Sequence, residues 1–432
     1  MHMLYPSLLR CTLLGTSLSL LTACADNHAA SQVETPTPVV QSATISLPTA
    51  AVSPTSTATF EQPTQSFASW QAAFRQEALS AGIQAAVFDA AFAGVSPDPA
   101  IIRADRSQPE FTRPVWEYLD SAISATRVRR GQALLAEHAS TLQAIEQRYG
   151  VDRHALVAIW GMESNFGQYM GDKSVIAALA TLAYEGRRPA FAHEQLLAAL
   201  RILQHGDVQP SRMRGSWAGA MGQTQFIPST YNQFAVDFDG DGRRDIWDSS
   251  ADALASAAHY LQKSGWQRGQ PWGVEVTLPS GFDYALADAE IRKPISEWRQ
   301  LGVNNIPAAD DQARAVLLLP AGHRGPAFLV LDNFRAILKY NNSTAYGLAI
   351  GLLSGALDSQ PGVQAAWPRS DRQLGRSERI ELQELLASKG YAPGAADGII
   401  GANTRKAVRA FQQSLGQPAD GYPSHELLQQ LR

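Results

Sequence analysis

The chain has 432 residues, of which 45% are hydrophobic and 18% are charged, and its formal net charge is −4. The 36 basic and 40 acidic residues are nearly balanced, which excludes a nucleic-acid binder held mainly by phosphate contacts. Two cysteines are too few for a disulfide framework or a cysteine-rich zinc module, and no apolar run reaches the roughly 18 residues of a membrane span. At roughly 100–200 residues per domain, the length indicates two or three domains.

Residues 1–23 have the pattern of an export signal. Arg10 precedes an apolar run that ends at Leu21, about the length of a signal-peptide core. The Leu-Thr-Ala-Cys segment that ends at Cys24 resembles a bacterial lipobox, which implies cleavage before Cys24 and lipidation of this residue. An ordinary signal peptide that ends near a cysteine is the alternative. Because Ala25 rather than an aspartate follows, we expect a lipid anchor at the periplasmic face of the outer membrane.

Residues 24–66 are rich in Ser, Thr and Pro and contain few charged residues. Such a segment cannot bury enough apolar area to offset its conformational entropy, so we expect a disordered tether. With a lipid at one end, this tether would let the folded body work at some distance from the membrane.

Apolar residues at helical spacing begin at Phe67 and continue through most of the chain. They predict helices at residues 67–78, 87–92, 132–149, 153–163, 192–205, 229–234, 250–264 and 333–340. Strand patterns are short and late, at residues 274–278, 315–319 and 327–331. These elements predict a mainly α (α+β) body with a small β-sheet at residues 67–365. A linker at 366–375 and a compact unit at 376–432 follow.

A candidate general acid lies at the end of the helix predicted for residues 153–163. Asp152 is a good N-cap for this helix. Glu163 extends the apolar stripe that contains Ile159 and Trp160. A carboxyl group at the end of a buried face should have a raised pKa, which a general acid needs at neutral pH. A solvated or salt-bridged glutamate is the alternative at a helix end.

A glycine-rich segment at residues 215–228 has the composition of a carbohydrate groove. Its small residues allow close approach to the backbone. Gln223 and Gln225 offer amide groups to hydroxyl and acetamido groups, and aromatic residues such as Phe226 offer flat faces to sugar rings. A glycine-rich turn between core helices is the alternative.

Four motifs, at residues 105–111, 161–167, 216–222 and 225–228, resemble those of a known family. The second reads Gly-Met-Glu-Ser-Asn-Phe-Gly and the third Ser-Trp-Ala-Gly-Ala-Met-Gly. In this order they resemble the membrane-bound lytic murein transglycosylases of the B family, over about residues 67–365. The resemblance implies a lysozyme-like fold and cleavage of the β-1,4 bond between N-acetylmuramic acid (MurNAc) and N-acetylglucosamine (GlcNAc) in peptidoglycan.

The resemblance also implies roles for individual residues, and it makes Glu163 the catalytic acid and base. It implies substrate-binding positions at Ser216, Gln225, Phe226, Tyr260, Tyr340, Asn341 and Tyr118, of which Tyr118 lies in the weakest motif. Arg187 and Arg188 are candidates for binding muramyl lactyl or peptide carboxylates, although solvated surface arginines are the alternative.

The implied chemistry needs one carboxyl group, whereas ordinary glycosidases need two. Glu163 would protonate the glycosidic oxygen while the muramyl N-acetyl group stabilises the cationic centre. The glutamate would then deprotonate the C6 hydroxyl, which closes a 1,6-anhydro ring. Two alternatives are a muramidase in which water attacks the same bond and a non-catalytic lipoprotein that only binds the wall.

Residues 237–248 have the spacing of an EF-hand calcium loop, with carboxylates at positions 1, 3, 5, 9 and 12 and glycine at position 6. The predicted ligands of a structural Ca²⁺ are Asp237, Asp239, Asp241, the carbonyl of Arg243, and Asp248. Because position 12 is usually Glu, Asp252 is the alternative ligand there. Arg243 and Arg244 could also neutralise the loop without a metal. We expect no organic cofactor.

The segment at residues 376–432 resembles the peptidoglycan-binding domain of many cell-wall enzymes. Three short helices joined by Asp-Gly turns should form a small core from Leu385, Val408, Phe411 and Leu428. Asp397, Thr404 and Arg405 could touch the wall, but each could equally be a cap or a surface residue, so none is assigned a binding role.

The expected partners are peptidoglycan glycan strands and, through the lipid anchor, a membrane. The C-terminal unit should raise the local concentration of the enzyme at the wall. Murein synthases or scaffold proteins are candidate protein partners. We expect a monomer.

Overall fold

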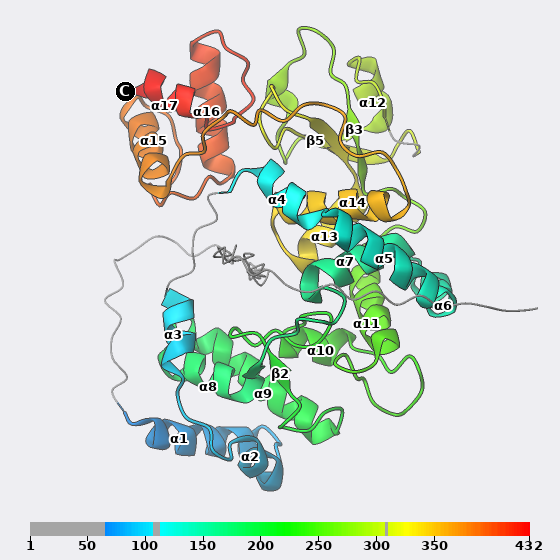
Figure 1. Ribbon diagram of the computed structural model, residues 1–432. Helices are drawn as coiled ribbons and strands as arrows, with labels where there is room; N and C mark the ends of the chain where they lie inside the picture. The colour runs from blue at the N-terminus through cyan, green and yellow to red at the C-terminus, as the bar shows by residue number, and fades with distance from the viewer. Residues whose placement is uncertain (1–64, 107–112, 307–309) are drawn as a thin grey trace, which may run out of the picture. The chain divides into compact units, whose positions relative to one another are not determined.

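The computed structural model describes residues 65–106, 113–306 and 310–432 (Figure 1). The predicted signal peptide, the lipidation site Cys24 and almost all of the predicted tether lie outside the described residues, as does most of the motif at 105–111. In the described ranges, no helix is both long and apolar enough to cross a membrane.

A first group of helices packs around one apolar core. It comprises α1 (Phe67–Ser80), α2 (Ala85–Ala91), α8 (Val175–Glu185), α9 (Pro189–His205) and α10 (Pro228–Phe234). Phe74, Ile176, Leu200 and Tyr231 lie in this core. Helix α3 (Pro99–Arg106) packs on the outside of α8 through Ile101, in a separate small cluster. The short antiparallel pair β1 (Lys173–Ser174) and β2 (Arg214–Gly215) leads directly into the glycine-rich segment.

A second group of helices carries Glu163. It comprises α4 (Val115–Ala122), α5 (Ala125–Glu137), α6 (Ala139–Tyr149), α7 (Arg153–Ser164), α11 (Ser250–Lys263), α13 (Asp332–Tyr340) and α14 (Thr344–Leu357). Helix α7 packs against α5, α11 and α14, so eight of its 12 residues are buried (Figure 1). Asp152 accepts hydrogen bonds from the backbone N–H groups of His154 (2.9 Å) and Ala155 (3.0 Å), as expected of an N-cap.

The range 132–149, predicted as one helix, is two helices that divide at His138. The imidazole of His138 lies 5.6 Å from the ring of Trp160 on α7. Leu134 on α5 and Leu142 on α6 both reach the core around α7, so the break serves the packing of a buried helix.

Four antiparallel strands form the small sheet in the order β3 (Gly273–Val276), β6 (Ala327–Val330), β5 (Arg314–Leu318) and β4 (Lys293–Pro294). The 3₁₀ helix η1 (Tyr284–Leu286) and α12 (Ile295–Gln300) lie between β3 and β5 in the chain. Leu317 and Leu329 face a core that contains Trp298 of α12, while Val316 and Phe328 face α4 and α14. The three predicted strands are confirmed, and β4 was not predicted.

The C-terminal domain consists of α15 (Arg376–Ser388), α16 (Ala402–Ser414) and α17 (His425–Leu431), as predicted. Val408, Phe411 and Leu428 lie in its core, with Leu385 partly buried against it. No helix or strand separates α14 from α15 in this fully described stretch. The connecting segment is nevertheless anchored, because Arg369 makes two hydrogen bonds to Asp120 (2.7 and 3.0 Å). The mainly α fold with a small sheet is therefore confirmed.

Candidate active site

Glu163 is the penultimate residue of α7, and the end of this helix is tied to the glycine-rich segment. The Ser164 hydroxyl donates to the carbonyl of Gln223 (2.7 Å) and accepts from the backbone N–H of Gly167 (2.9 Å). Asn165 ends the helix in the left-handed region, with φ of 48°. Two segments about 60 residues apart are thus held together next to Glu163.

The carboxyl group of Glu163 has a hydrogen-bond partner that sequence reasoning missed. The hydroxyl of Tyr346, on α14, donates to Glu163 Oε1 at 2.5 Å. Burial raises the pKa of Glu163 to about 7, and the hydrogen bond from Tyr346 opposes this rise. Near neutral pH the same group can therefore give up a proton and take one back. The sequence could have indicated Tyr346, because it is a large residue with a hydroxyl on a helix of mainly small and apolar residues. A buried tyrosine hydroxyl needs a hydrogen-bond partner.

Two further tyrosines lie close enough to Glu163 to interact with its charge. Burial raises the pKa of Tyr118 and of Tyr340, and the nearby Glu163 carboxylate adds to both shifts. Both phenols therefore stay neutral. In the described part of the chain, no second carboxylate contributes to the pKa shift of Glu163.

Three of the predicted groove residues form an aromatic cluster beside this site. The ring centroids of Phe226, Tyr260 and Tyr340 lie 5.2–5.8 Å apart. The hydroxyl of Tyr340 donates to the carbonyl of Thr224 at 2.8 Å, which joins the cluster to the glycine-rich segment. The structure thus brings together side chains that are far apart in the sequence.

The polar groove candidates have different local roles. Ser216 Oγ accepts from the backbone N–H groups of Ala218 (3.3 Å) and Ala220 (3.1 Å), which holds a tight turn. Gln225 has φ of 51°, a strained conformation for a non-glycine residue. Asn341 is buried, and its Oδ1 atom has no hydrogen-bond partner among the residues that the structure describes. An unsatisfied buried acceptor of this kind is available to a donor on a ligand.

The two predicted arginines have partners elsewhere. Arg187 donates to Asp105 from its backbone N–H (2.8 Å) and from Nε (3.3 Å). The guanidinium of Arg188 lies 4.6 Å from the ring centre of Phe191. These contacts do not connect either arginine with Glu163, so a role in binding substrate carboxylates stays a prediction.

The acidic loop groups a different set of carboxylates from the one predicted. One carboxylate oxygen each from Asp237, Asp239, Asp241 and Asp252 lie within 4.8 Å of one another. Asp248 instead forms an ion pair with Arg212. Asp252 lies in the first turn of α11, next to the loop. Burial raises the pKa of its carboxyl group. The structure therefore places the alternative, Asp252, in the acidic cluster. Four carboxylates suit a hard cation such as Ca²⁺.

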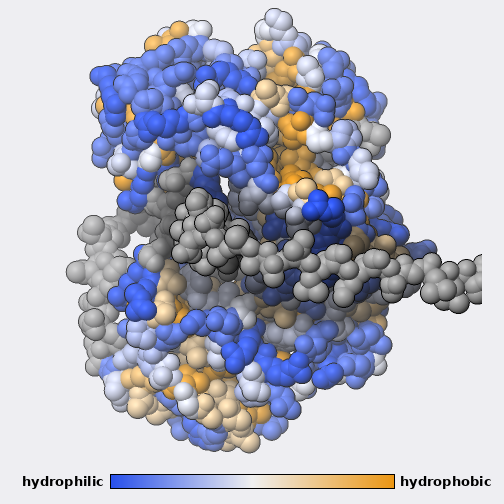
Figure 2. Space-filling model, in the orientation of Figure 1, coloured by the Kyte–Doolittle hydropathy of each residue, from blue (hydrophilic) through white to orange (hydrophobic). Residues whose placement is uncertain are grey.

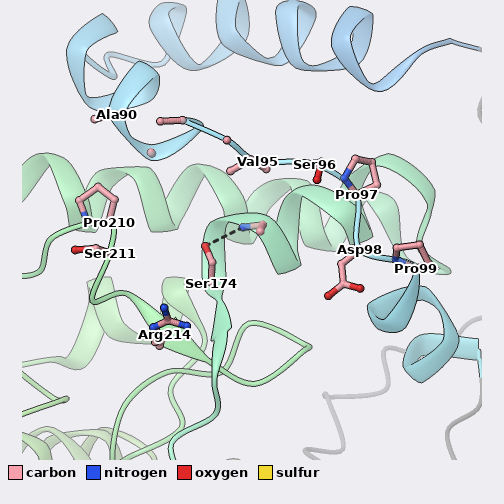
Figure 3. Close-up of a pocket in the computed structure, with 14 residues that line it drawn as sticks. Ala90, Val95, Ser96, Pro97, Asp98, Pro99, Ser174, Pro210, Ser211 and Arg214 are labelled. Atoms are coloured by element: carbon pink, nitrogen blue, oxygen red, sulfur yellow. Dashed lines mark hydrogen bonds between the residues drawn. The ribbon is translucent and has the colours of Figure 1, made fainter.

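A separate hollow of about 740 Å³ lies between the connection from α2 to α3 and the β1–β2 pair. Figure 3 shows the chain from Ala90 to Pro99 on one side of it, and Ser174 and Arg214 on another. Neither Glu163 nor any predicted groove residue lines this hollow.

The fold and the site together define a lysozyme-like enzyme that works on a glycan with one carboxyl group. The chain matches the transglycosylase SLT domain at residues 66–355 and a peptidoglycan-binding domain at residues 375–431. The chain therefore belongs to the family of lytic transglycosylases that act on peptidoglycan.

Relatives agree with this assignment. SltB3 from Pseudomonas aeruginosa, solved in complex with NAG-anhNAM-pentapeptide, is 65% identical, with a TM-score of 0.83 over 85% of this chain and 100% of that chain. The membrane-bound lytic murein transglycosylase B of Escherichia coli K12 is 33% identical over 247 residues, which are 56% of this chain and 66% of that protein. The Escherichia coli lytic transglycosylase Slt35 in complex with calcium is 29% identical, with a TM-score of 0.58 over 67% of this chain and 92% of that chain.

Proposed function

We propose that the protein cleaves the MurNAc–GlcNAc bond of peptidoglycan and leaves a 1,6-anhydromuramyl end, with Glu163 as both acid and base. The observation that carries the proposal is a single, partly buried carboxyl group at the end of α7, whose desolvation raises its pKa to about 7. The ligand of the SltB3 structure, which contains an anhydro sugar, supports the same product.

The proton moves in two steps. In the first, protonated Glu163 donates to the glycosidic oxygen as the C1–O bond breaks, and the muramyl acetamido oxygen stabilises C1. In the second, the carboxylate of Glu163 accepts the proton of the C6 hydroxyl while the C6 oxygen bonds to C1. The glutamate ends in its starting form, and no water is consumed. Tyr346 donates to Oε1, so the transferred proton is carried by Oε2.

We assign the glycan-binding groove to the residues around Glu163. Tyr260 and Tyr340, which are partly exposed, would stack on sugar faces, and Phe226, which is only 2% exposed, would support their rings from the core. Tyr118 would close the site near the carboxyl group. Ser216, Gln225 and Asn341 would bind hydroxyl and acetamido groups, with the unpaired Oδ1 of Asn341 as the clearest acceptor. Arg187 and Arg188 would meet lactyl or peptide carboxylates at the edge of the groove.

We further propose a structural Ca²⁺ in the acidic loop, held by Asp237, Asp239, Asp241, Asp252 and the carbonyl of Arg243. The close approach of four carboxylates supports it, as does the calcium complex of Slt35. The ion would neutralise the loop between α10 and α11 and so stabilise the helix that carries Tyr260.

The location of the protein is the last part of the proposal. Residues 1–23 would be removed, Cys24 would carry lipid, and the body at residues 67–365 would work at the periplasmic face of the outer membrane. The Escherichia coli relative is named as membrane-bound, which supports an anchor. The domain at 376–432 would keep the enzyme on the wall.

Digestion of purified murein by the wild-type protein and by Glu163→Gln tests the reaction. We expect the variant to lose about 10³-fold in rate, because it keeps the shape of the side chain but has no proton to exchange. Mass spectrometry should find wild-type products lighter than hydrolysed ones by one water. Hydrolysed reducing ends would identify a muramidase, and unchanged glycan cleavage by the variant would remove Glu163 from the mechanism.

A further inference from the structure

The C-terminal domain contains the same turn twice. In the first copy, Nε2 of Gln383 donates to Asp397 Oδ1 (3.3 Å), and Oε1 of Gln383 accepts from the backbone N–H of the following glycine (2.8 Å). In the second copy, Gln412 holds Asp420 and its glycine through the same two bonds, at 2.7 and 2.9 Å. In both copies Oδ1 also accepts from the backbone N–H two residues later, at 2.8 Å.

The similarity extends to the backbone around the turns. Gly398 has φ of 80° and Gly421 has φ of 72°. An arginine lies seven residues before each glutamine, Arg376 in the first copy and Arg405 in the second. A Cβ atom added to the turn glycine would lie 3.3 and 3.1 Å, respectively, from the carbonyl oxygen of that arginine. The two turns therefore have equivalent backbones. They differ in the partners of the outer carboxylate oxygen, Oδ2.

In the second turn, Oδ2 of Asp420 is occupied by the catalytic body. It accepts from the backbone N–H of His323 at 2.8 Å and lies 2.6 Å from the imidazole Nδ1 of the same residue. Gly322 lies so close that an added Cβ would be 2.7 Å from Asp420 Oδ2 and 3.0 Å from Tyr422 Cβ. The second turn therefore binds a peptide segment of the catalytic body in two ways. Asp420 Oδ2 accepts from the backbone N–H and the imidazole of His323, and Gly322 packs against Tyr422.

In the first turn, the same surface is open. Asp397 is exposed, and its Oδ2 has no hydrogen-bond partner in the described parts of the chain. Ile399, which corresponds to Tyr422, has 65% of its surface exposed. The face of this domain seen in Figure 2 is mainly hydrophilic. Ile399 is the most exposed of the four large hydrophobic side chains at the surface of the described parts of the chain.

We infer that the Asp397–Ile399 turn is the peptide-binding site of the C-terminal domain. Its ligand is a stem peptide of peptidoglycan, which offers amide N–H groups to Asp397 Oδ2 and an alanine methyl group to Ile399. The stem peptide would contact this turn in the same way as the segment of Gly322 and His323 contacts the second turn. This inference rests on the proposed function only in that the protein acts on peptidoglycan, because binding by this turn needs no catalysis.

The test uses the full chain, as Glu163→Gln so that no substrate is cut, with ¹³C-labelled isoleucine methyl groups. A synthetic stem pentapeptide without sugar is titrated, and the Ile399 methyl signal is followed by NMR. We expect this signal to shift on binding. Asp397→Asn should weaken binding about tenfold, because Asn keeps the Oδ1 acceptor but replaces Oδ2 with a donor. Glu384→Gln, which removes an exposed charge from α15, is the matched control and should bind as the parent does.

The outcomes are separable. An Ile399 signal that stays still at high peptide concentration, or equal affinity of Asp397→Asn and the parent, overturns the inference. A shift with N-acetylglucosamine tetrasaccharide but not with peptide would assign the turn to glycan and also overturn it. Should Asp397→Asn unfold the domain, Ile399→Ser changes only an exposed side chain and should weaken peptide binding as well. Calorimetry measures this binding, because the variant lacks the Ile399 methyl signal. Failure here would leave the production of anhydro ends intact, so the two proposals fail independently.

Discussion

Glu163 and the acidic loop at residues 237–252 put the same functional group in opposite surroundings. The carboxyl group of Glu163 lies among tyrosines and has one hydrogen-bond partner, Tyr346. Four carboxylates of the loop lie within 4.8 Å of one another, and backbone N–H groups donate to them. An isolated, buried carboxyl group holds a proton near neutral pH, whereas a cluster of ionised carboxylates favours a cation.

Replacement of Asp252 should have the largest effect on the difference between the two sites, because it should disrupt the acidic loop. It accepts from the backbone N–H groups of Phe238 (2.7 Å), Asp239 (3.3 Å) and Asp245 (2.9 Å), so Asp252→Ala leaves three donors without their acceptor. We expect a loss of about 3 kcal/mol in the free energy of unfolding, measured with urea. A loss below about 0.5 kcal/mol would mean that the loop does not depend on this carboxylate.

Addition of Ca²⁺ should stabilise the loop and leave the chemistry at Glu163 unchanged. At about 100 times its dissociation constant, a ligand of the folded state adds about 2.7 kcal/mol, which thermal unfolding with calcium or a chelator measures. Asp237→Asn should abolish the stabilisation. Asp248→Asn is the control and should keep it, because Asp248 pairs with Arg212. Loss of the calcium response in the control alone would restore Asp248 as a ligand in place of Asp252.

The raised pKa of Glu163 should make stability depend on pH. Its pKa rises from 4.5 in the unfolded chain to about 7 in the folded protein, so the folded state binds the proton more tightly. The wild type should therefore lose about 3 kcal/mol relative to Glu163→Gln as the pH rises from 4.5 to above 7. Urea unfolding of both proteins at pH 5 and pH 8.5 measures this difference, and parallel pH profiles would contradict it.

Tyr346→Phe should have the smallest effect of the variants considered. It would show how far the hydrogen bond from Tyr346 sets the pKa of Glu163. The hydroxyl of Tyr346 lowers the pKa of Glu163, so its removal should raise that pKa above about 7. The basic limb of the pH–rate profile should move to higher pH. The rate at neutral pH should fall about tenfold, because Glu163 loses the hydrogen bond that orients its carboxyl group. An unmoved basic limb with a lower rate would indicate a purely structural role for this tyrosine.

Periodicity predicted the elements that have one apolar face. Helix α7 with its N-cap Asp152, strand β3 and the helices of the C-terminal domain are such cases. Strands β5 and β6 are apolar on both faces and were predicted as short apolar runs. Helices α8 and α14 were missed because they are buried on almost all sides and so have no polar face to create a period. The break at His138 was also missed, since it depends on the ring of Trp160 packed against it.

The candidate site divides in the same way. Glu163 was found from its place on a local stripe, and the groove residues came from short motifs. Tyr346 lies 183 residues away from Glu163, and no local pattern connects them. The two Asp-Gly turns have similar local sequences, yet one is buried against His323 and the other is exposed.

The sequence alone determined the fold class, the place of Glu163 at a helix end, the acidic loop and the C-terminal domain, because each depends on residues that are near one another in the chain. Tertiary structure decided the partner of the acid, the choice of Asp252 over Asp248 and the different surroundings of the two turns. The physical reason is that burial and hydrogen bonding between distant segments set the pKa of a carboxyl group and its available lone pairs, and only packing brings those segments together.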